Sequence, residues 1–317
     1  MPVSNPTTEP MVLGDLAGVL DVPIPYLQRV RSYYQGLGYG APYEWAQPEA
    51  PPQLHRLGTP ITQCRIAIVT TAAPVAPGTP RQSGKPSYDA SIKFYKVTSP
   101  LTDVEVDLRI NHVAIDWDHT TAVDQGTYFP LRALRSLAAR RTIGDLSPRF
   151  HCVPTHRSQR TTISEYVPEL VRRCREDDVD AALLVPNCPV CHQTMALAAR
   201  GLEEAGISTV VMGAARDIVE YVGVPRLLFS DLPLGNACGK PGDEGSQMEA
   251  AQQALALLES ATFPRTTMKS TLIWSSDPAW KLDYSNIARL SAEAIAQRRA
   301  EFDQVKETAK QMRRATT

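Results

Sequence analysis

The chain has no long apolar run and no excess of either charge. Its 317 residues include 33 basic and 34 acidic side chains, for a net charge of −1, so neither nucleic acid nor a membrane surface is indicated as a partner. No apolar run approaches the roughly 20 residues of a membrane-spanning helix. The N-terminus, MPVSNPTTEPM, lacks the basic start and apolar core of a signal peptide. We therefore expect a cytoplasmic globular protein.

Cysteine is scarce, with six in the whole chain. In a reducing compartment such thiols stay free or cycle catalytically. Cys188 and Cys191 are spaced Cys-x-x-Cys, but no second such pair and no paired histidine is spaced to complete a four-ligand zinc site. The spacing therefore favours redox or nucleophilic use over structural zinc. The sequence at 188–192 also matches a haem-attachment motif, which we set aside because such attachment goes with export.

The two cysteines lie at a joint of a predicted strand–helix–strand unit. Ala181–Val185 is a short apolar run typical of a buried parallel strand. Helical spacing of apolar residues begins at Pro189, and Ile207–Met212 is the next strand. Open α/β sheets carry their sites at the carboxyl ends of strands, and the N-terminus of a helix favours thiolate over thiol. We expect Cys188 to attack a substrate and Cys191 to resolve the bond that forms.

A second concentration of polar side chains follows a strand-like run at 104–110. Five of them lie within thirteen positions: His112, Asp116, Asp118, His119 and Asp124. Such residues suit a hard metal or a general acid–base pair, and the alternative is that Asp118 and His119 cap local turns. Because the carboxyl ends of parallel strands share one edge, we expect Asp118 and His119 near Cys188, with the histidine as its base or as the acid for a leaving group.

Four further residues are candidates for substrate binding: Thr71, Arg157, His192 and Asn236. The loop at 151–160 carries two histidines and two arginines, which suits an anionic group such as a carboxylate, although a solvated loop is the alternative. Asn236 lies in a loop rich in Gly, Asn and Pro that also holds Cys238. If the thiols bind zinc instead, the expected ligands are Cys188, Cys191, His192 and Cys238.

Strand-like runs separated by helical patterns predict an α/β fold, with a mainly parallel sheet flanked by helices in Rossmann-like layers. We divide the chain into an N-terminal leader, helices and Pro-rich arm at 1–60, an α/β domain at 61–260, and a C-terminal extension at 261–317 with a long helix. The aromatic arm and the apolar stripe of the terminal helix suit packing on the body or pairing with a second copy.

The sequence resembles the glycine/sarcosine/betaine and D-proline reductase family, in particular the subunits called selenoprotein B. The resemblance spans roughly residues 60 to 245. It is carried by the order of several short motifs: Ile68–Pro74, Asp118-His119, Phe129–Leu131, Ile143–Arg149, the Cys188 region, Val224–Arg226 and Asp231–Asn236. The resemblance implies reductive cleavage of an activated small substrate, with a pyruvoyl-bearing partner subunit in the glycine and proline systems.

The chain departs from the family in having no selenocysteine. In the family, two cysteines follow the selenocysteine. If Cys188 and Cys191 match those two, Val185 occupies the position of the selenocysteine. If Cys188 itself occupies that position, a sulfur atom replaces the selenium. A thiolate is a poorer leaving group than a selenolate, which leaves a milder dithiol reduction open. The resemblance also predicts a homo-oligomer, a dimer in the simplest case, and an electron-donating thiol protein. The alternative is a non-catalytic, zinc-binding homologue.

Overall fold

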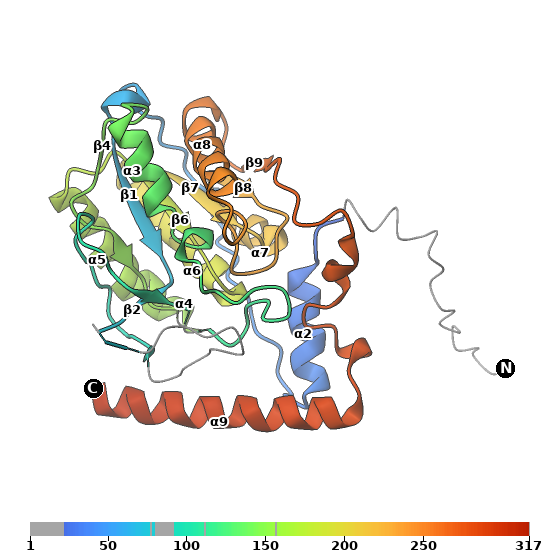
Figure 1. Cartoon of the computed structure of the whole chain (residues 1–317). Coiled ribbons are helices and arrows are strands. Elements are labelled where there is room, and N and C mark those ends of the chain that lie inside the picture. Colours follow the sequence, from blue (N-terminus) through green and yellow to red (C-terminus); the bar gives the residue numbers. More distant parts are fainter. Residues whose placement is uncertain (1–21, 77, 80–91, 111, 156, 317) are drawn as a thin grey trace.

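The computed structural model describes residues 22–316 except 77, 80–91, 111 and 156, so the predicted leader lies outside it. Within these residues, seven strands form one parallel sheet in the order β4-β1-β6-β7-β8-β9, with β5 beside β1 (Figure 1). The strands are β1 (Arg65–Thr70), β4 (Asp145–Leu146), β5 (His151–Cys152), β6 (Ala181–Val185), β7 (Ser208–Gly213), β8 (Arg226–Phe229) and β9 (Thr266–Lys269). A separate antiparallel pair joins β2 (Ala73–Pro74) and β3 (Leu108–Arg109).

Helices cover both faces of the sheet. They are α2 (Tyr26–Gly36), α3 (Leu131–Ala139), α4 (Gln159–Thr161), α5 (Val167–Glu176), α6 (Pro189–Glu204), α7 (Arg216–Val222), α8 (Glu244–Ser260) and α9 (Ala292–Thr316). Shorter 3-10 or π turns lie at Ile61–Gln63, Gln125–Thr127, Thr162–Tyr166, Pro278–Leu282 and Ile287–Arg289. The mainly parallel sheet, the flanking helices and the long C-terminal helix confirm the predicted fold class.

The central strand β6 explains why two layers of helix are needed. Leu183 and Val185 belong to the core shared with α3 and α8, whereas Ala182 and Leu184 belong to the core shared with α5, α6 and α7. Successive side chains of a strand point to opposite faces, so an all-apolar strand must be covered on both sides. Every residue of β6 is buried as a result.

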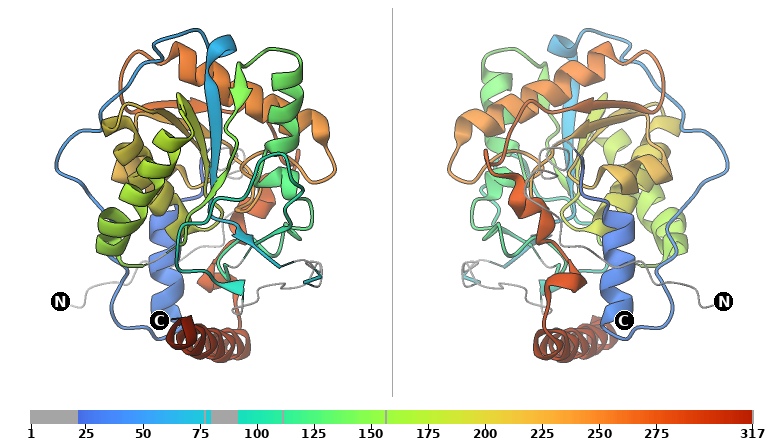
Figure 2. Two further views of the ribbon diagram at one scale, coloured as in Figure 1. Left: turned by 90° about the vertical axis from the view of Figure 1, so that its left-hand side faces the viewer. Right: turned by 90° about the vertical axis from the view of Figure 1, so that its right-hand side faces the viewer.

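The Pro-rich arm wraps around the body (Figure 2) and ends at a buried ion pair. Ala46 N–H donates to Gln193 on α6, 2.7 Å away, and Arg226 donates to the carbonyl of His55, also 2.7 Å away. Arg226 and Glu203 are 2.8 Å apart with fully buried side chains. Breaking a buried pair of this kind costs about 3–5 kcal/mol, so it locks the arm, α6 and β8 together.

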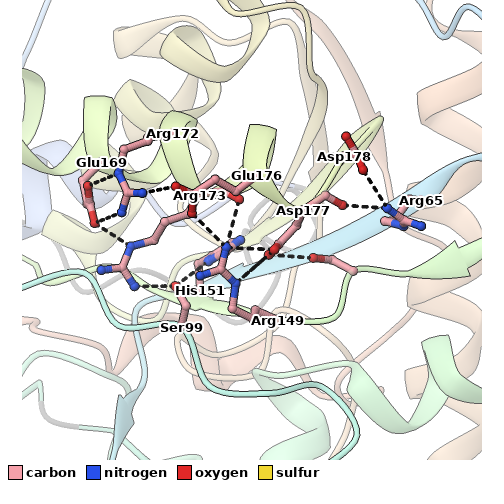
Figure 3. Close-up of polar contacts among 11 residues, drawn as sticks. Arg65, Ser99, Arg149, His151, Glu169, Arg172, Arg173, Glu176, Asp177 and Asp178 are labelled. Carbon is pink, nitrogen blue, oxygen red and sulfur yellow. Dashed lines mark hydrogen bonds and ion pairs between the residues drawn. The ribbon is translucent and has the colours of Figure 1, made fainter.

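A polar network joins β5 to α5 (Figure 3). Arg149 donates to both carboxylate oxygens of Asp177 at 2.8–3.0 Å, and Arg173 donates to Ser99, which also contacts Nδ1 of His151 at 2.8 Å. Burial lowers the pKa of His151 to about 4, so this histidine is neutral. The network holds β5 in place, and the loop that follows β5 carries two residues of the candidate site.

The helices α2 and α9 lie below the carboxyl ends of the strands (Figure 1). Phe302 of α9 packs edge-on against Tyr34 and Tyr39, with ring centroids 5.2 and 5.5 Å apart. None of the described helices is long and apolar enough to cross a membrane. The division at residues 60 and 260 stays a prediction, and β9 continues the sheet beyond residue 260.

Candidate active site

The N-terminus of α6 presents two thiols at the carboxyl end of β6. Cys188 caps the helix: its backbone is extended, and its Sγ accepts a hydrogen bond from the N–H of Cys191 at 3.3 Å. Pro189 follows at the first helical position, where its missing N–H costs no hydrogen bond. This local sequence therefore places both sulfurs at the positive end of the helix dipole.

The two sulfurs are 2.8 Å apart and share a hydrogen bond. Burial alone would raise the pKa of the Cys191 thiol, but hydrogen bonds from Cys188, His112 and Thr155 and the charge of His112 hold it well below its usual range. Burial, together with the hydrogen bond to Cys191 and the charge on it, raises the pKa of Cys188. These two directions favour the thiolate on Cys191 and the thiol on Cys188.

Three residues from other segments surround this thiol pair. The hydroxyl of Thr155 is 3.1 Å from Sγ of Cys191. Nε2 of His112 donates to the carbonyl of Thr71 at 3.1 Å, and Oγ1 of Thr71 accepts from the N–H of Asn187 at 3.2 Å. Thr71 therefore orients both the histidine and the residue before Cys188.

Lys93 supplies a positive charge to the pair. It is half-buried, and burial lowers its pKa while the charges of Cys188 and Cys191 act in the opposite direction. Its charge in turn favours the thiolate form of Cys188. Sequence reasoning missed Lys93 because nothing in its neighbourhood forms a motif, and Thr155 because a lone threonine gives no signal.

His192 fixes the turn beside the thiols. Its Nε2 accepts from the N–H groups of Ala214 and Ala215, each at 3.0 Å, so Nδ1 carries the proton and donates to the carbonyl of Cys188 at 2.8 Å. Burial lowers its pKa to about 4. A Cβ at Gly213 would stand 3.0 Å from the imidazole, so a larger residue there would push the ring by a few tenths of an ångström. Both nitrogens of His192 are therefore occupied by the backbone.

Cys188 lines a cavity of about 530 Å3 between α2, α6 and α9. Aromatic side chains form much of its wall: Tyr33, Tyr34, Tyr43, Trp117, Tyr284 and Phe302. The exposed guanidinium of Arg157 also lines it, 5.4 Å from the ring centre of Tyr34 and 5.9 Å from that of Tyr43. Among the described residues, Arg157 forms no ion pair with a carboxylate. The cavity thus offers a thiol, aromatic walls and charged side chains of both signs, since Asp118, Arg298 and Glu301 line it together with Arg157.

The other predicted residues lie at different distances from the thiols. Asp118 is exposed and lines the same cavity. His119 instead contacts Asp116 at 2.9 Å and Asp283 at 3.3 Å, and the hydrogen bond to Asp116 raises its pKa. Asn236 bonds the hydroxyl of Thr120 and the carbonyl of Pro233. Within the polar cluster at 112–124, His112 is the histidine that reaches the thiol pair.

The donor atoms of His112, Cys188 and Cys191 lie within 4.8 Å of one another and are the residues best placed to hold a metal in the described part of the chain. Zinc–sulfur bonds of about 2.3 Å in a tetrahedral site would hold the two sulfurs about 3.8 Å apart. The observed 2.8 Å is about 1 Å shorter than that and lies between this separation and the roughly 2.05 Å of a disulfide. Cys238 is buried, its pKa is raised by that burial, and it lies outside this group.

The chain is similar to one curated protein, the D-proline reductase subunit gamma of Acetoanaerobium sticklandii. The two are 27% identical over 201 residues, which cover 63% of this chain and 82% of that protein. No protein-family model matches the chain, and no solved structure does. The similarity confirms the resemblance to the glycine/sarcosine/betaine and D-proline reductase family.

Removing the imidazole that faces the thiols should raise the pKa of the pair. We expect His112→Asn to slow alkylation of Cys188 by iodoacetamide near neutral pH, by roughly tenfold for each pKa unit, and to move the rise of the rate to higher pH. His119→Asn is the matched control, since His119 bonds Asp116 and Asp283. The measurement is a pH–rate profile followed by peptide mass spectrometry, and equal profiles for the two variants would contradict the role of His112.

Proposed function

We propose, on the premise that this chain is related to a D-proline reductase subunit, that it is a thiol-dependent cytoplasmic reductase that cleaves a bond in a small substrate. The observation that carries the proposal is the thiol–thiolate contact of 2.8 Å between Cys188 and Cys191 at the wall of the cavity. Burying a thiolate costs free energy unless neighbouring groups stabilise its charge. Here four groups do so: the Cys188 thiol, His112, Thr155 and Lys93.

The exposure of each sulfur to the cavity distinguishes the roles of the two cysteines. Cys188 is 5% exposed and lines the cavity, whereas Cys191 is fully buried behind it. Cys188 is therefore the nucleophile, although the charge rests on Cys191. As Cys188 attacks, its proton passes to the Cys191 thiolate, which acts as the base.

The reaction balances as a two-electron reduction. A substrate R–X, the Cys188 thiol and the Cys191 thiolate give R–H, X− and a Cys188–Cys191 disulfide, so the pair supplies two electrons and one proton, and solvent protonates X− where it is basic. Closing the disulfide requires the sulfurs to move from 2.8 Å to about 2.05 Å, a shift of less than 1 Å. An external dithiol, small or carried by a protein, then restores both thiols by exchange.

The cavity favours a substrate that carries a carboxylate. Arg157 is held over Tyr34 and Tyr43, and no carboxylate among the described residues neutralises it. A guanidinium in this setting binds a carboxylate through two parallel hydrogen bonds. The name of the relative makes D-proline the first substrate to test. The family resemblance adds glycine and betaine.

The first experiment measures turnover with a dithiol reductant. We expect Cys188→Ser to abolish substrate reduction and Cys191→Ser to reduce it by several orders of magnitude, because no resolving thiol remains. Cys64→Ser is the control: that thiol contacts the carbonyls of Thr59 and Pro60, which a hydroxyl can also contact.

Two outcomes would overturn this proposal. One is full turnover in Cys188→Ser. The other is stoichiometric zinc in the wild-type protein that is lost in Cys188→Ser, with no Cys188–Cys191 disulfide after oxidation, which would establish the zinc-binding alternative.

The second experiment tests the carboxylate. Arg157→Gln should raise KM for a carboxylate substrate by roughly 10- to 100-fold, the cost of a lost hydrogen bond to a charged group, and should leave KM for the matching amide nearly unchanged. Arg160→Gln is the control, because Arg160 is an exposed arginine three residues on, in the short helix α4. An unchanged KM for the carboxylate in Arg157→Gln would place substrate binding elsewhere.

A further inference from the structure

One side of α9 forms part of the wall of the cavity beside Cys188. The residues of this helix that line the cavity are spaced as on one face of a helix: Ala294, Gln297, Arg298, Glu301 and Phe302. Other parts of the wall come from α2 and from the start of α6. Cys188 is only 5% exposed, so the position of α9 limits which molecules can reach its sulfur.

An aromatic clamp made of Tyr34, Tyr39 and Phe302 holds the middle of α9. The ring of Phe302 packs edge-on against both tyrosines, with centroids 5.2 and 5.5 Å away. Beside the clamp, the hydroxyl of Tyr39 donates to Asp303 at 2.6 Å, and Arg299 donates to the carbonyl of the residue just after α2, also at 2.6 Å. These contacts join α9 to the end of α2 and to the loop that follows it.

The remainder of α9 is attached weakly to the body. The helix lies outside the layers formed by the sheet and its covering helices (Figure 2). None of its residues whose exposure the structure describes is buried, and Ile295 and Val305 are half-buried. Near its C-terminal end, the hydroxyl of Tyr95 donates to the carbonyl of Ala309 at 3.0 Å. In α6, by contrast, most residues are buried. An element with few buried apolar side chains opens at a low cost in free energy while the core stays folded, so α9 can leave the body far more easily than α6 can.

The chain just before α9 is anchored, which places the joint at the start of the helix. Tyr284 is 3% exposed, and Ile287 packs so closely on α2 that a Cβ at Gly36 would overlap it. Ser291 belongs to the helix, because its hydroxyl accepts a hydrogen bond from an N–H of the first turn at 3.2 Å. Leu290 lies between the anchored turn and this cap, so α9 can swing about Leu290 with its own hydrogen bonds intact.

We propose that α9 is a lid, which swings about Leu290 to admit a bulky thiol reductant to Cys188 and closes again through the aromatic clamp. This role rests on the proposed function: the thiolate of the reductant attacks the sulfur of Cys188 in the disulfide, forms a mixed disulfide and releases Cys191 as a thiolate, and the second thiol of the reductant then releases Cys188. With α9 closed, the cavity of about 530 Å3 takes a small molecule, whereas a thiol on a protein surface reaches Cys188 only after α9 has moved.

The first test compares a small and a bulky thiol reagent on the reduced, full-length protein. N-ethylmaleimide should reach Cys188 with α9 closed, whereas a maleimide on a long polyethylene glycol chain should react only with the open form. Phe302→Ala removes the central ring of the clamp and should speed the bulky reagent at Cys188 by about tenfold, with little change for N-ethylmaleimide. The rates are read by peptide mass spectrometry.

Two further variants separate opening of the lid from enlargement of the cavity. Tyr39→Phe removes only a hydroxyl that bonds Asp303, from a residue that does not line this cavity, and should speed the bulky reagent several-fold. Gln304→Ala is the control, because Gln304 is exposed on the same helix and lies outside the clamp. If Phe302→Ala and Tyr39→Phe leave the ratio of the two rates at its wild-type value, α9 is a fixed wall and the proposal fails.

The second test measures opening by hydrogen exchange of the backbone amides. A helix detached from the body is only marginally stable, so opening exposes its amides to exchange. The amides of α9 should exchange much faster than those of α6, and Phe302→Ala should speed exchange in α9 by the same factor as the bulky reagent, since both report one opening equilibrium. Exchange in α9 as slow as in α6 would overturn the proposal. If neither maleimide alkylates Cys188 while α9 still opens, the lid stands and the proposed thiol chemistry fails.

Discussion

The hydrogen bond between Cys188 and Cys191 is the interaction on which the site depends. Burial opposes a charge at this position, and the charge persists because Cys188, His112 and Thr155 bond the same sulfur while Lys93 lies nearby. These groups come from segments far apart in the chain. Cys188 and Thr155 follow parallel strands that end at one edge of the sheet, whereas His112 follows β3 of the separate antiparallel pair, so the parallel sheet accounts for only part of this arrangement.

The residues packed behind the thiols restrict the movement of the two sulfurs and of His112. Thr71 orients His112 and the backbone before Cys188, and His192 joins the start of α6 to the turn after β7. The buried pair of Glu203 and Arg226 fixes the far end of α6. A site supported in this way loses little entropy when substrate binds.

The sequence predicted what depends on local pattern. The strand at Ala181–Val185, the helix from Pro189 and the thiol pair at their joint follow from periodicity and spacing within about thirty residues. The family resemblance is supported by the relative at 27% identity. The choice between His112 and His119 depends on contacts with Thr71 and Asp283, which no local pattern encodes. Lys93 and the short strand β9 have no apolar alternation or motif and could not be predicted.

The central claim, that Cys188 and Cys191 form one two-electron couple, is tested most directly by a redox titration. The protein is equilibrated in dithiol buffers of increasing potential, alkylated and measured by intact and peptide mass spectrometry. The account predicts that both cysteines lose reactivity together in a single two-electron transition, with the loss of two hydrogen atoms and no change at the other four thiols. Separate transitions, or mixed disulfides with the buffer and no internal bond, would contradict it.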